Sequence, residues 1–253
     1  MPEPLPEPLL AVDQVSCWFG GLKAVDRASL TAPAGRITAL IGPNGAGKTT
    51  LFSIISGFVR AREGVVRYAG LDITGKPPHQ LARLGLARTF QVVQPFAGLS
   101  VRDNILVGAH LHHRERATAL AAADRVGRDL GLADFLDRPA DTLTVAARKR
   151  LELARALATE PKLLLLDEVL AGLNPTEIRD IVPLVRDLCR RGITILMIEH
   201  VMQAVMVLAE HIFVLAEGRI IAQGAPAQVA RNAAVVEAYL GHGAAAKWGA
   251  AHE

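Results

Sequence analysis

The chain has 253 residues, 51% of them hydrophobic, and a formal net charge of +3. This length is enough to bury one large core, or one core with a smaller lobe. The small net charge, without a long block of like charges, argues neither for a nucleic-acid partner nor for an anionic membrane surface, and we expect no nucleic-acid partner. The most apolar stretch, residues 193–209, is interrupted by Glu199 and His200, so we predict no transmembrane helix. The two cysteines, Cys17 and Cys189, lie far apart without metal-binding spacing, which fits a reduced cytosolic setting.

The proline-rich residues 1–8 lack the basic region of a signal peptide, and we interpret them as a loose tail. Residues 9–91 predict strands around one glycine-rich loop and the helix that follows it. The strand signal fades over residues 92–142, where Ser100 is placed to cap a helix over 101–109 and an alanine-rich helix is expected at 114–130. We expect residues 92–142 to form a small helical lobe. The strands expected before it are 10–15, 28–31, 37–41, 64–68 and 86–90.

From residue 143 to residue 241, helices alternate with apolar strands, which predicts a mainly parallel sheet covered on both faces. We expect this part and residues 9–91 to form one α/β core, followed by a C-terminal tail over 242–253. The strands expected here are 163–166, 194–198, 212–215 and 219–221.

The glycine-rich loop at residues 42–49 matches the phosphate-loop pattern G-x-x-x-x-G-K-[ST], between an apolar strand and a helical run. Its glycines let backbone N–H groups wrap a phosphate chain, and the helix N-terminus adds partial positive charge. Lys48 can reach the β- and γ-phosphates, and the Thr49 hydroxyl can ligate Mg²⁺. The alternative, a plain glycine-rich turn with an exposed lysine, does not explain the full match and its flanks. The predicted phosphate-binding residues are Gly42, Pro43, Asn44, Gly45, Ala46, Gly47, Lys48, Thr49 and Thr50.

Two further strands are followed by residues that suit phosphate chemistry. Four leucines at 163–166 predict a strand buried on both faces, and Asp167 and Glu168 follow it. Asp167 would hold the Mg²⁺ shell, and Glu168 would accept a proton from a water that attacks the γ-phosphate. His200 follows the strand at 194–198, where it can hydrogen-bond a γ-phosphate. The alternatives are an acidic pair that leads a helix and an ordinary solvated histidine.

These motifs, with Gln91 between them, resemble the ATP-binding cassette ATPases in order and spacing over nearly the whole chain. The resemblance implies a phosphate-loop nucleoside triphosphatase fold with a mainly parallel core sheet, an antiparallel edge sheet and a helical lobe. It implies that Phe19 stacks on adenine and that His200 contacts the γ-phosphate. It also implies that Gln91 touches Mg²⁺ and the attacking water, and links to the membrane partner. Two such domains pair head to tail in this family, and each ATP lies between one phosphate loop and the partner's signature loop.

Four short runs, at 19–25, 87–91, 171–175 and 236–241, look like the cassettes of branched-chain amino-acid importers. This likeness implies a subunit that hydrolyses ATP with Mg²⁺ on the cytoplasmic face of the inner membrane. Its partners would be a second cassette, transmembrane permease subunits and, indirectly, a substrate-binding protein. A cassette that acts on ribosomes or DNA is the rival, but such proteins usually carry two cassettes or long insertions, which this chain lacks.

The signature loop departs from the family's Leu-Ser-Gly-Gly-Gln, because residues 143–147 read Leu-Thr-Val-Ala-Ala. Thr144 keeps a hydroxyl, and Ala146 keeps its N–H but adds a Cβ where the backbone should approach the γ-phosphate. We still expect both residues to contact nucleotide. Val169 and Val201 replace the usual proline after Glu168 and the usual aspartate after His200. The altered loop leaves open a cassette that forms one inactive composite site in a heterodimer.

Overall fold

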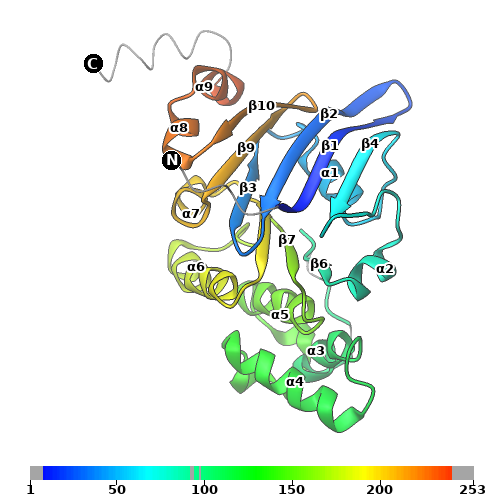
Figure 1. Cartoon of the computed structure of the whole chain (residues 1–253). Coiled ribbons are helices and arrows are strands. Elements are labelled where there is room, and N and C mark those ends of the chain that lie inside the picture. The colour runs from blue at the N-terminus through cyan, green and yellow to red at the C-terminus, as the bar shows by residue number, and fades with distance from the viewer. Residues whose placement is uncertain (1–7, 92–93, 97, 241–253) are drawn as a thin grey trace, which may run out of the picture. The chain divides into compact units, whose positions relative to one another are not determined.

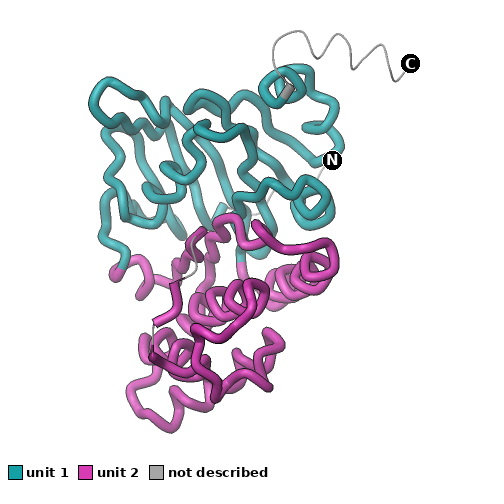
Figure 2. Tube along the Cα trace, turned by 180° about the vertical axis from the view of Figure 1, so that it is seen from behind, with its two compact units in different colours: residues 1–78, 194–253 teal, residues 79–193 magenta. Residues whose placement is uncertain are grey.

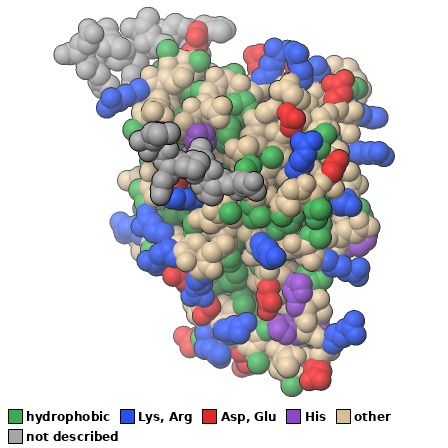
Figure 3. Space-filling view, viewed as in Figure 1, with side chains coloured by type: hydrophobic (Ala, Val, Ile, Leu, Met, Phe, Trp, Pro, Cys, Tyr) green, Lys and Arg blue, Asp and Glu red, His purple; other side chains and the backbone are tan. Residues whose placement is uncertain are grey.

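The structure is a computed structural model that describes residues 8–91, 94–96 and 98–240. Two compact units make up the chain, one of residues 1–78 with 194–253 and one of residues 79–193 (Figure 2). Within the described ranges, no helix combines the length and the apolar character that crossing a membrane requires. On the face shown in Figure 3, lysine and arginine side chains are interspersed with aspartate and glutamate, as the small net charge leads one to expect.

The first unit contains the antiparallel sheet that was predicted. Its strands are β1 (Pro8–Phe19), β2 (Leu22–Pro33), β4 (Glu63–Tyr68) and β5 (Leu71–Asp72), in the order β2-β1-β4-β5. All three strand pairs are antiparallel. Buried and exposed residues alternate along much of β2, which is the pattern of a strand with one face in the core.

The same unit holds the strands that carry the phosphate loop and His200. β3 (Ile37–Ile41) pairs in parallel with β8 (Thr194–Ile198) and with β9 (His211–Ala216), and β10 (Arg219–Gly224) runs antiparallel to β9. Of these strands, β3, β9 and β10 are labelled in Figure 1. Every residue of β3 and β8 is buried, as continuous apolar runs predict for strands covered on both faces. The helices of this unit include α1 (Lys48–Ile55), α7 (Met202–Leu208), α8 (Pro226–Ala230) and α9 (Ala233–Leu240).

The second unit has a parallel strand pair and a group of helices. β6 (Leu86–Arg88) pairs with β7 (Leu163–Asp167), and every residue of β7 is buried. Ser100 caps α3 by accepting a hydrogen bond from the Asp103 N–H, as predicted. A Cβ at Gly108 would lie 2.5 Å from the Arg155 carbonyl oxygen, so glycine allows α3 to approach α5 closely. The helices are α2 (Pro78–Arg83), α3 (Val101–Ala109), α4 (Arg116–Asp129), α5 (Val145–Leu157) and α6 (Pro175–Arg190), with 3₁₀ turns at Ala133–Phe135 and Ala140–Thr142.

Each predicted strand is present, and the fold class is confirmed. The strand expected over 86–90 ends at Arg88, although the Thr89 N–H still donates to the Leu165 carbonyl oxygen of β7 at 2.9 Å. The next N–H, that of Phe90, donates to the Glu152 carboxylate. The two-residue β5 was not predicted. The helices within residues 92–142 belong to the second unit, while the lobe with those boundaries stays a prediction. Pro8 already belongs to β1, and the rest of the predicted tails lies outside the described residues.

Candidate functional site

The phosphate loop joins β3 to α1, and its glycines adopt left-handed or otherwise glycine-specific backbone angles. Their φ values are +154° at Gly42, +79° at Gly45 and +102° at Gly47. A Cβ would lie 1.9 Å from the Leu215 carbonyl oxygen at Gly42, and 2.1 Å from that of Ala24 at Gly47. At Gly45 a Cβ would meet nothing within 4 Å. Packing therefore requires glycine at positions 42 and 47. Gly45 instead leaves an open face that a phosphate chain can approach.

Lys48 holds the loop in its compact form. Its ammonium donates to the carbonyl oxygens of Gly42 at 2.7 Å and Pro43 at 3.0 Å, and the residue is only 6% exposed. The Ala46 N–H also donates to the Pro43 oxygen, at 3.2 Å. Thr49, in the first turn of α1, is exposed. The lysine charge and the threonine hydroxyl therefore stand on one short segment with the loop's backbone N–H groups.

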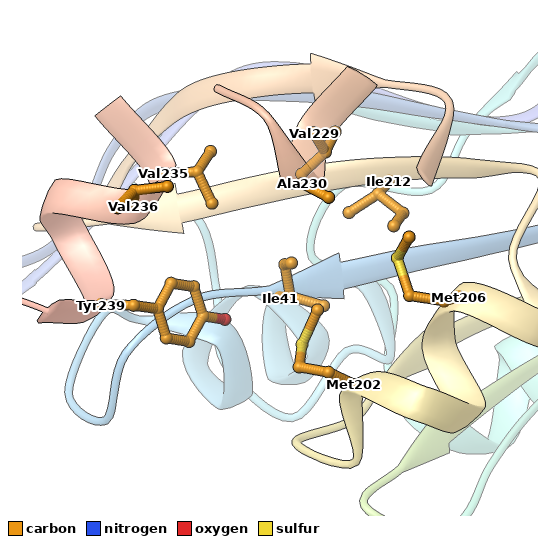
Figure 4. Close-up of a pocket in the computed structure, with 9 residues that line it drawn as sticks. All are labelled: Ile41, Met202, Met206, Ile212, Val229, Ala230, Val235, Val236 and Tyr239. Carbon is orange, nitrogen blue, oxygen red and sulfur yellow. The ribbon is translucent and has the colours of Figure 1, made fainter. Parts of the chain in front are cut away.

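An apolar cavity of about 300 Å³ lies within the same unit, beside the strand that leads into the loop. Its walls come from β3, α7, β9, α8 and α9, with Ile41 and Tyr239 among the lining residues (Figure 4). Burial raises the pKa of Tyr239, and a hydrogen bond from the main chain of Gly42 opposes that rise. The tyrosine thereby ties α9 to the first residue of the phosphate loop. In the sequence, Tyr239 stands out only as part of the run 236–241, which looks like the cassettes of branched-chain amino-acid importers.

Phe19 and His200 are the other predicted residues of the first unit. Phe19 ends β1 and is 53% exposed, so its ring is accessible for stacking. His200 follows β8 by two residues and is also exposed, while Glu199 before it is buried. Their contacts with adenine and with the γ-phosphate stay predictions.

Asp167 is the last residue of β7 and is almost fully buried. Its Oδ2 lies 2.7 Å from Nη2 of Arg88, and its N–H donates to Thr89 Oγ1 at 3.0 Å. The other carboxylate oxygen, Oδ1, has no hydrogen-bond partner among the residues that the structure describes. A buried oxygen without a donor is the kind of ligand that Mg²⁺ takes, so Asp167 fits its predicted role. Arg88 was not predicted as a site residue, although it stands in the run 87–91.

The structure brings Gln91 and Glu168 together. Gln91 Nε2 donates to Glu168 Oε2 at 2.6 Å. Glu168 is 7% exposed and has a φ of +52°, which is unusual for a residue other than glycine. Such backbone strain gathers at functional sites and persists only where surrounding contacts hold it. The acidic residue that was predicted to act on water is therefore fixed in both its backbone and its side chain.

The altered signature loop begins α5. Thr144 is the N-cap residue, and its hydroxyl accepts a hydrogen bond from the Ala147 N–H at 3.3 Å. Ala146 lies in the first turn of the helix, and Ala147 is only 8% exposed. Farther along α5, Lys149 and Glu152 are buried. Sequence reasoning missed both, although charged residues among the apolar residues of a helix are the signal that could have found them.

The predicted residues thus fall into two sets. The phosphate loop, Phe19 and His200 belong to the unit of residues 1–78 and 194–253. The unit of residues 79–193 contains the others, which are Gln91, Thr144, Ala146, Asp167 and Glu168.

Comparison with known proteins gives two family matches, both to transporter families. A model of the ABC transporter family matches residues 25–171, and a model described as a branched-chain amino acid ATP-binding cassette transporter matches residues 219–245. The chain is 38% identical to the high-affinity branched-chain amino acid transport ATP-binding protein BraF of Pseudomonas aeruginosa, over 92% of this chain and 98% of that protein. It is also 38% identical to LivG of Escherichia coli, which carries the same description, over 93% and 98%.

Solved structures agree with these matches. A nucleotide-free ATP-binding cassette from an ABC transporter superposes with a TM-score of 0.85 and 34% identity, over 93% of this chain and all of the other. The ADP conformation of an ABC transporter cassette superposes with a TM-score of 0.83 and 34% identity, over 93% and 99%.

Proposed function

The chain belongs to the family of ABC transporter ATP-binding cassettes, and we propose that it hydrolyses ATP to power a membrane importer of branched-chain or related amino acids. The two relatives named above, described as branched-chain amino acid transport proteins, support the class of solute. The match of residues 219–245 to the branched-chain family supports it independently of the phosphate loop. The observation that carries the enzymatic part is the Gln91–Glu168 hydrogen bond directly after the buried Asp167.

The proposed reaction is in-line attack of water on the γ-phosphate of ATP. Backbone N–H groups of residues 44–49 and the Lys48 ammonium would bind the phosphates, and the Phe19 ring would stack on adenine. Glu168 would orient the water and take its proton, while Gln91 keeps the carboxylate in place. His200 would contact the γ-phosphate. Preorganised charges of this kind stabilise the transition state because they need no rearrangement when the phosphorus–oxygen bond breaks.

Mg²⁺ would be held by Thr49, Asp167 and Gln91, and when bound with ATP it would neutralise charge on the phosphate oxygens. This assignment is supported by Oδ1 of Asp167, to which no residue in the described part of the chain donates a hydrogen bond. Arg88 pairs with the other oxygen, Oδ2, and this ion pair fixes the orientation of the carboxylate toward a cation.

We expect two cassettes to pair head to tail, with Thr144 and Ala146 next to the partner's ATP. The transmembrane permease subunits would bind the cassettes at the cytoplasmic face of the inner membrane, and a substrate-binding protein would act through those permeases. A second candidate is a cassette that leaves the partner's ATP in an inactive composite site. The side chains at 145–147 favour it, because they replace both glycines and the glutamine of the family's loop.

Reconstitution tests this function. The chain is assembled with its permease subunits in proteoliposomes, and the uptake of labelled leucine is measured with and without ATP. We expect ATP-dependent uptake that is lost with Lys48→Ala, since removal of the loop's cation weakens phosphate binding by about 1.5–3 kcal/mol per charged hydrogen bond. ATP turnover without uptake of any branched-chain amino acid would contradict the proposed solute, and absence of ATP turnover would contradict the enzymatic part.

A further inference from the structure

Three charged side chains of α5 contact the main chain of the segment that contains Gln91. Lys149 Nζ donates to the Gln91 carbonyl oxygen at 3.2 Å, and Arg155 Nη1 donates to that of Gln94 at 3.0 Å. Between them, the Glu152 carboxylate accepts a hydrogen bond from the Phe90 N–H. Residues spaced three apart share one face of a helix, so α5 presents these groups in a row. These three contacts are made to backbone atoms of residues 90, 91 and 94. They therefore hold the segment in place independently of its side chains.

Lys149 also makes a second contact, with the residue that follows Asp167. Its ammonium also donates to the carbonyl oxygen of Glu168, at 3.1 Å. One ammonium thus bridges the main chains of Gln91 and Glu168, whose side chains hydrogen-bond to each other. The three residues form a closed ring of contacts, in which Lys149 fixes both backbones and the side-chain hydrogen bond fixes the carboxylate.

The location of this lysine is costly for folding. Lys149 is only 6% exposed, and burying an ammonium is unfavourable unless its donors are satisfied. Two carbonyl oxygens and the nearby Glu152 offset that cost. An apolar residue of similar volume would avoid it entirely, which indicates that the lysine serves more than packing. The positive φ of Glu168 supplies a reason, because a strained backbone needs a contact that holds it.

We propose that Lys149 is a positioning residue for ATP hydrolysis, and that its ammonium holds the main chains of Gln91 and Glu168 so that the Glu168 carboxylate faces the attacking water. The inference rests on the proposed ATPase function. It assigns no contact with nucleotide to Lys149, which acts only through the other two residues.

The test compares Lys149→Met and Lys149→Arg with the control Lys162→Met, which makes the same change at an exposed lysine of the same unit. ATP turnover, KM for ATP, the dissociation constant of ATP and the melting temperature are measured for each purified full-length chain. We expect Lys149→Met to lower kcat about tenfold or more, since small misplacements of reacting groups cost up to about 100-fold. KM and ATP affinity should stay within about twofold of wild type, because binding of the phosphates does not involve this lysine.

Lys149→Arg should recover most of kcat, because a guanidinium can donate to two carbonyl oxygens. Wild-type kcat in Lys149→Met, or a loss of ATP affinity equal to the loss of kcat, would overturn the inference. If Lys149→Met does not fold, Lys149→Gln keeps one amide donor and should show reduced kcat at unchanged KM; a wild-type kcat there would overturn it equally. A folded wild-type chain that binds ATP without hydrolysing it would instead contradict the proposed function, so the two failures are distinguishable.

Discussion

Gln91 Nε2 and Glu168 Oε2 lie 2.6 Å apart, although the two residues are 77 positions apart in the chain. The amide is a neutral donor and the carboxylate an acceptor, so the bond orients Glu168 without neutralising it. The amide thereby fixes the direction in which this carboxylate points. Gln91 also stands on the segment whose main chain Lys149, Glu152 and Arg155 contact.

Removal of the Arg88 guanidinium should destabilise the fold. In Arg88→Met the buried Asp167 would lose its ion pair, and breaking a buried pair from one side costs about 3–5 kcal/mol. Urea denaturation should therefore show a free energy of unfolding lower by several kcal/mol. The exposed Arg83, changed to Met, is the control and should shift stability by less than about 0.5 kcal/mol. Equal stabilities of the two variants would show that the ion pair contributes nothing.

Glu152 should make the stability of the protein fall as the pH rises above about 4.5. Burial raises the pKa of Glu152 above its ordinary value of 4.5, and this outweighs the hydrogen bond from the Phe90 amide and the charges of Lys149 and Arg155. The folded state therefore binds this proton more tightly than the unfolded state. The stabilisation that this proton gives is fully present below the pKa that Glu152 has in the unfolded state. It is lost as the pH rises through the pKa that Glu152 has in the folded state.

Glu152→Gln keeps an acceptor for the Phe90 N–H but cannot titrate. We therefore expect the variant to gain stability relative to wild type as the pH rises from acidic to neutral. The quantity compared is the free energy of unfolding of the variant minus that of wild type. Urea denaturation of both proteins across this range measures the difference. A difference that is independent of pH, or that decreases, would show that the pKa of Glu152 is not raised.

Local sequence patterns predicted the parts of the site that depend on consecutive residues. The loop at 42–49 carries glycines where the backbone takes positive φ, and its flanks alone specify a strand and a helix. Ser100 capped its helix because capping needs only a hydroxyl three residues before an N–H. The strands were found for the same reason, since apolar runs and alternation are local signals.

The contacts made by Arg88, Lys149 and Glu152 were not predicted, because each joins segments far apart in the chain. Nothing near residue 149 indicates that the Glu168 carbonyl oxygen will lie 3.1 Å from its ammonium. The Glu152 carboxylate likewise accepts from the Phe90 N–H across 62 positions of the chain. Local propensity does not record such contacts between segments that are distant in the chain.

Tyr239→Phe should loosen the C-terminal helix from the phosphate loop. The variant keeps the ring that lines the apolar cavity but loses the hydroxyl that bonds with the Gly42 main chain. We expect a loss of about 0.5–1.5 kcal/mol, the usual net contribution of one hydrogen bond. Tyr239→Ala should cost more, because it also removes the apolar ring. Thermal unfolding that is identical for Tyr239→Phe and wild type would show that the hydroxyl contributes nothing to stability.

Restoring the signature loop should raise the ATPase rate if that loop limits hydrolysis. The triple variant Thr144→Ser, Ala146→Gly, Ala147→Gln should hydrolyse ATP about tenfold faster or more as a homodimer, equivalent to about 1.4 kcal/mol of transition-state stabilisation. Serine keeps the hydroxyl that caps α5. Because Ala147 is buried, glutamine at this position can disturb packing. The double variant Thr144→Ser, Ala146→Gly keeps Ala147 and is the control for such damage. An unchanged rate in both variants would exclude the inactive-site alternative.

Glu168→Gln tests the central claim most directly. The amide is nearly isosteric with the carboxylate but cannot accept the proton of the attacking water, so the variant should bind ATP normally and lose about two to four orders of magnitude in turnover. Glu115→Gln changes an exposed carboxylate of the same unit and should leave the rate unchanged. The measurement is the steady-state release of phosphate, together with the dissociation constant of ATP, for both variants and wild type. Near-normal hydrolysis by Glu168→Gln would contradict the assignment of Glu168 as the residue that activates water.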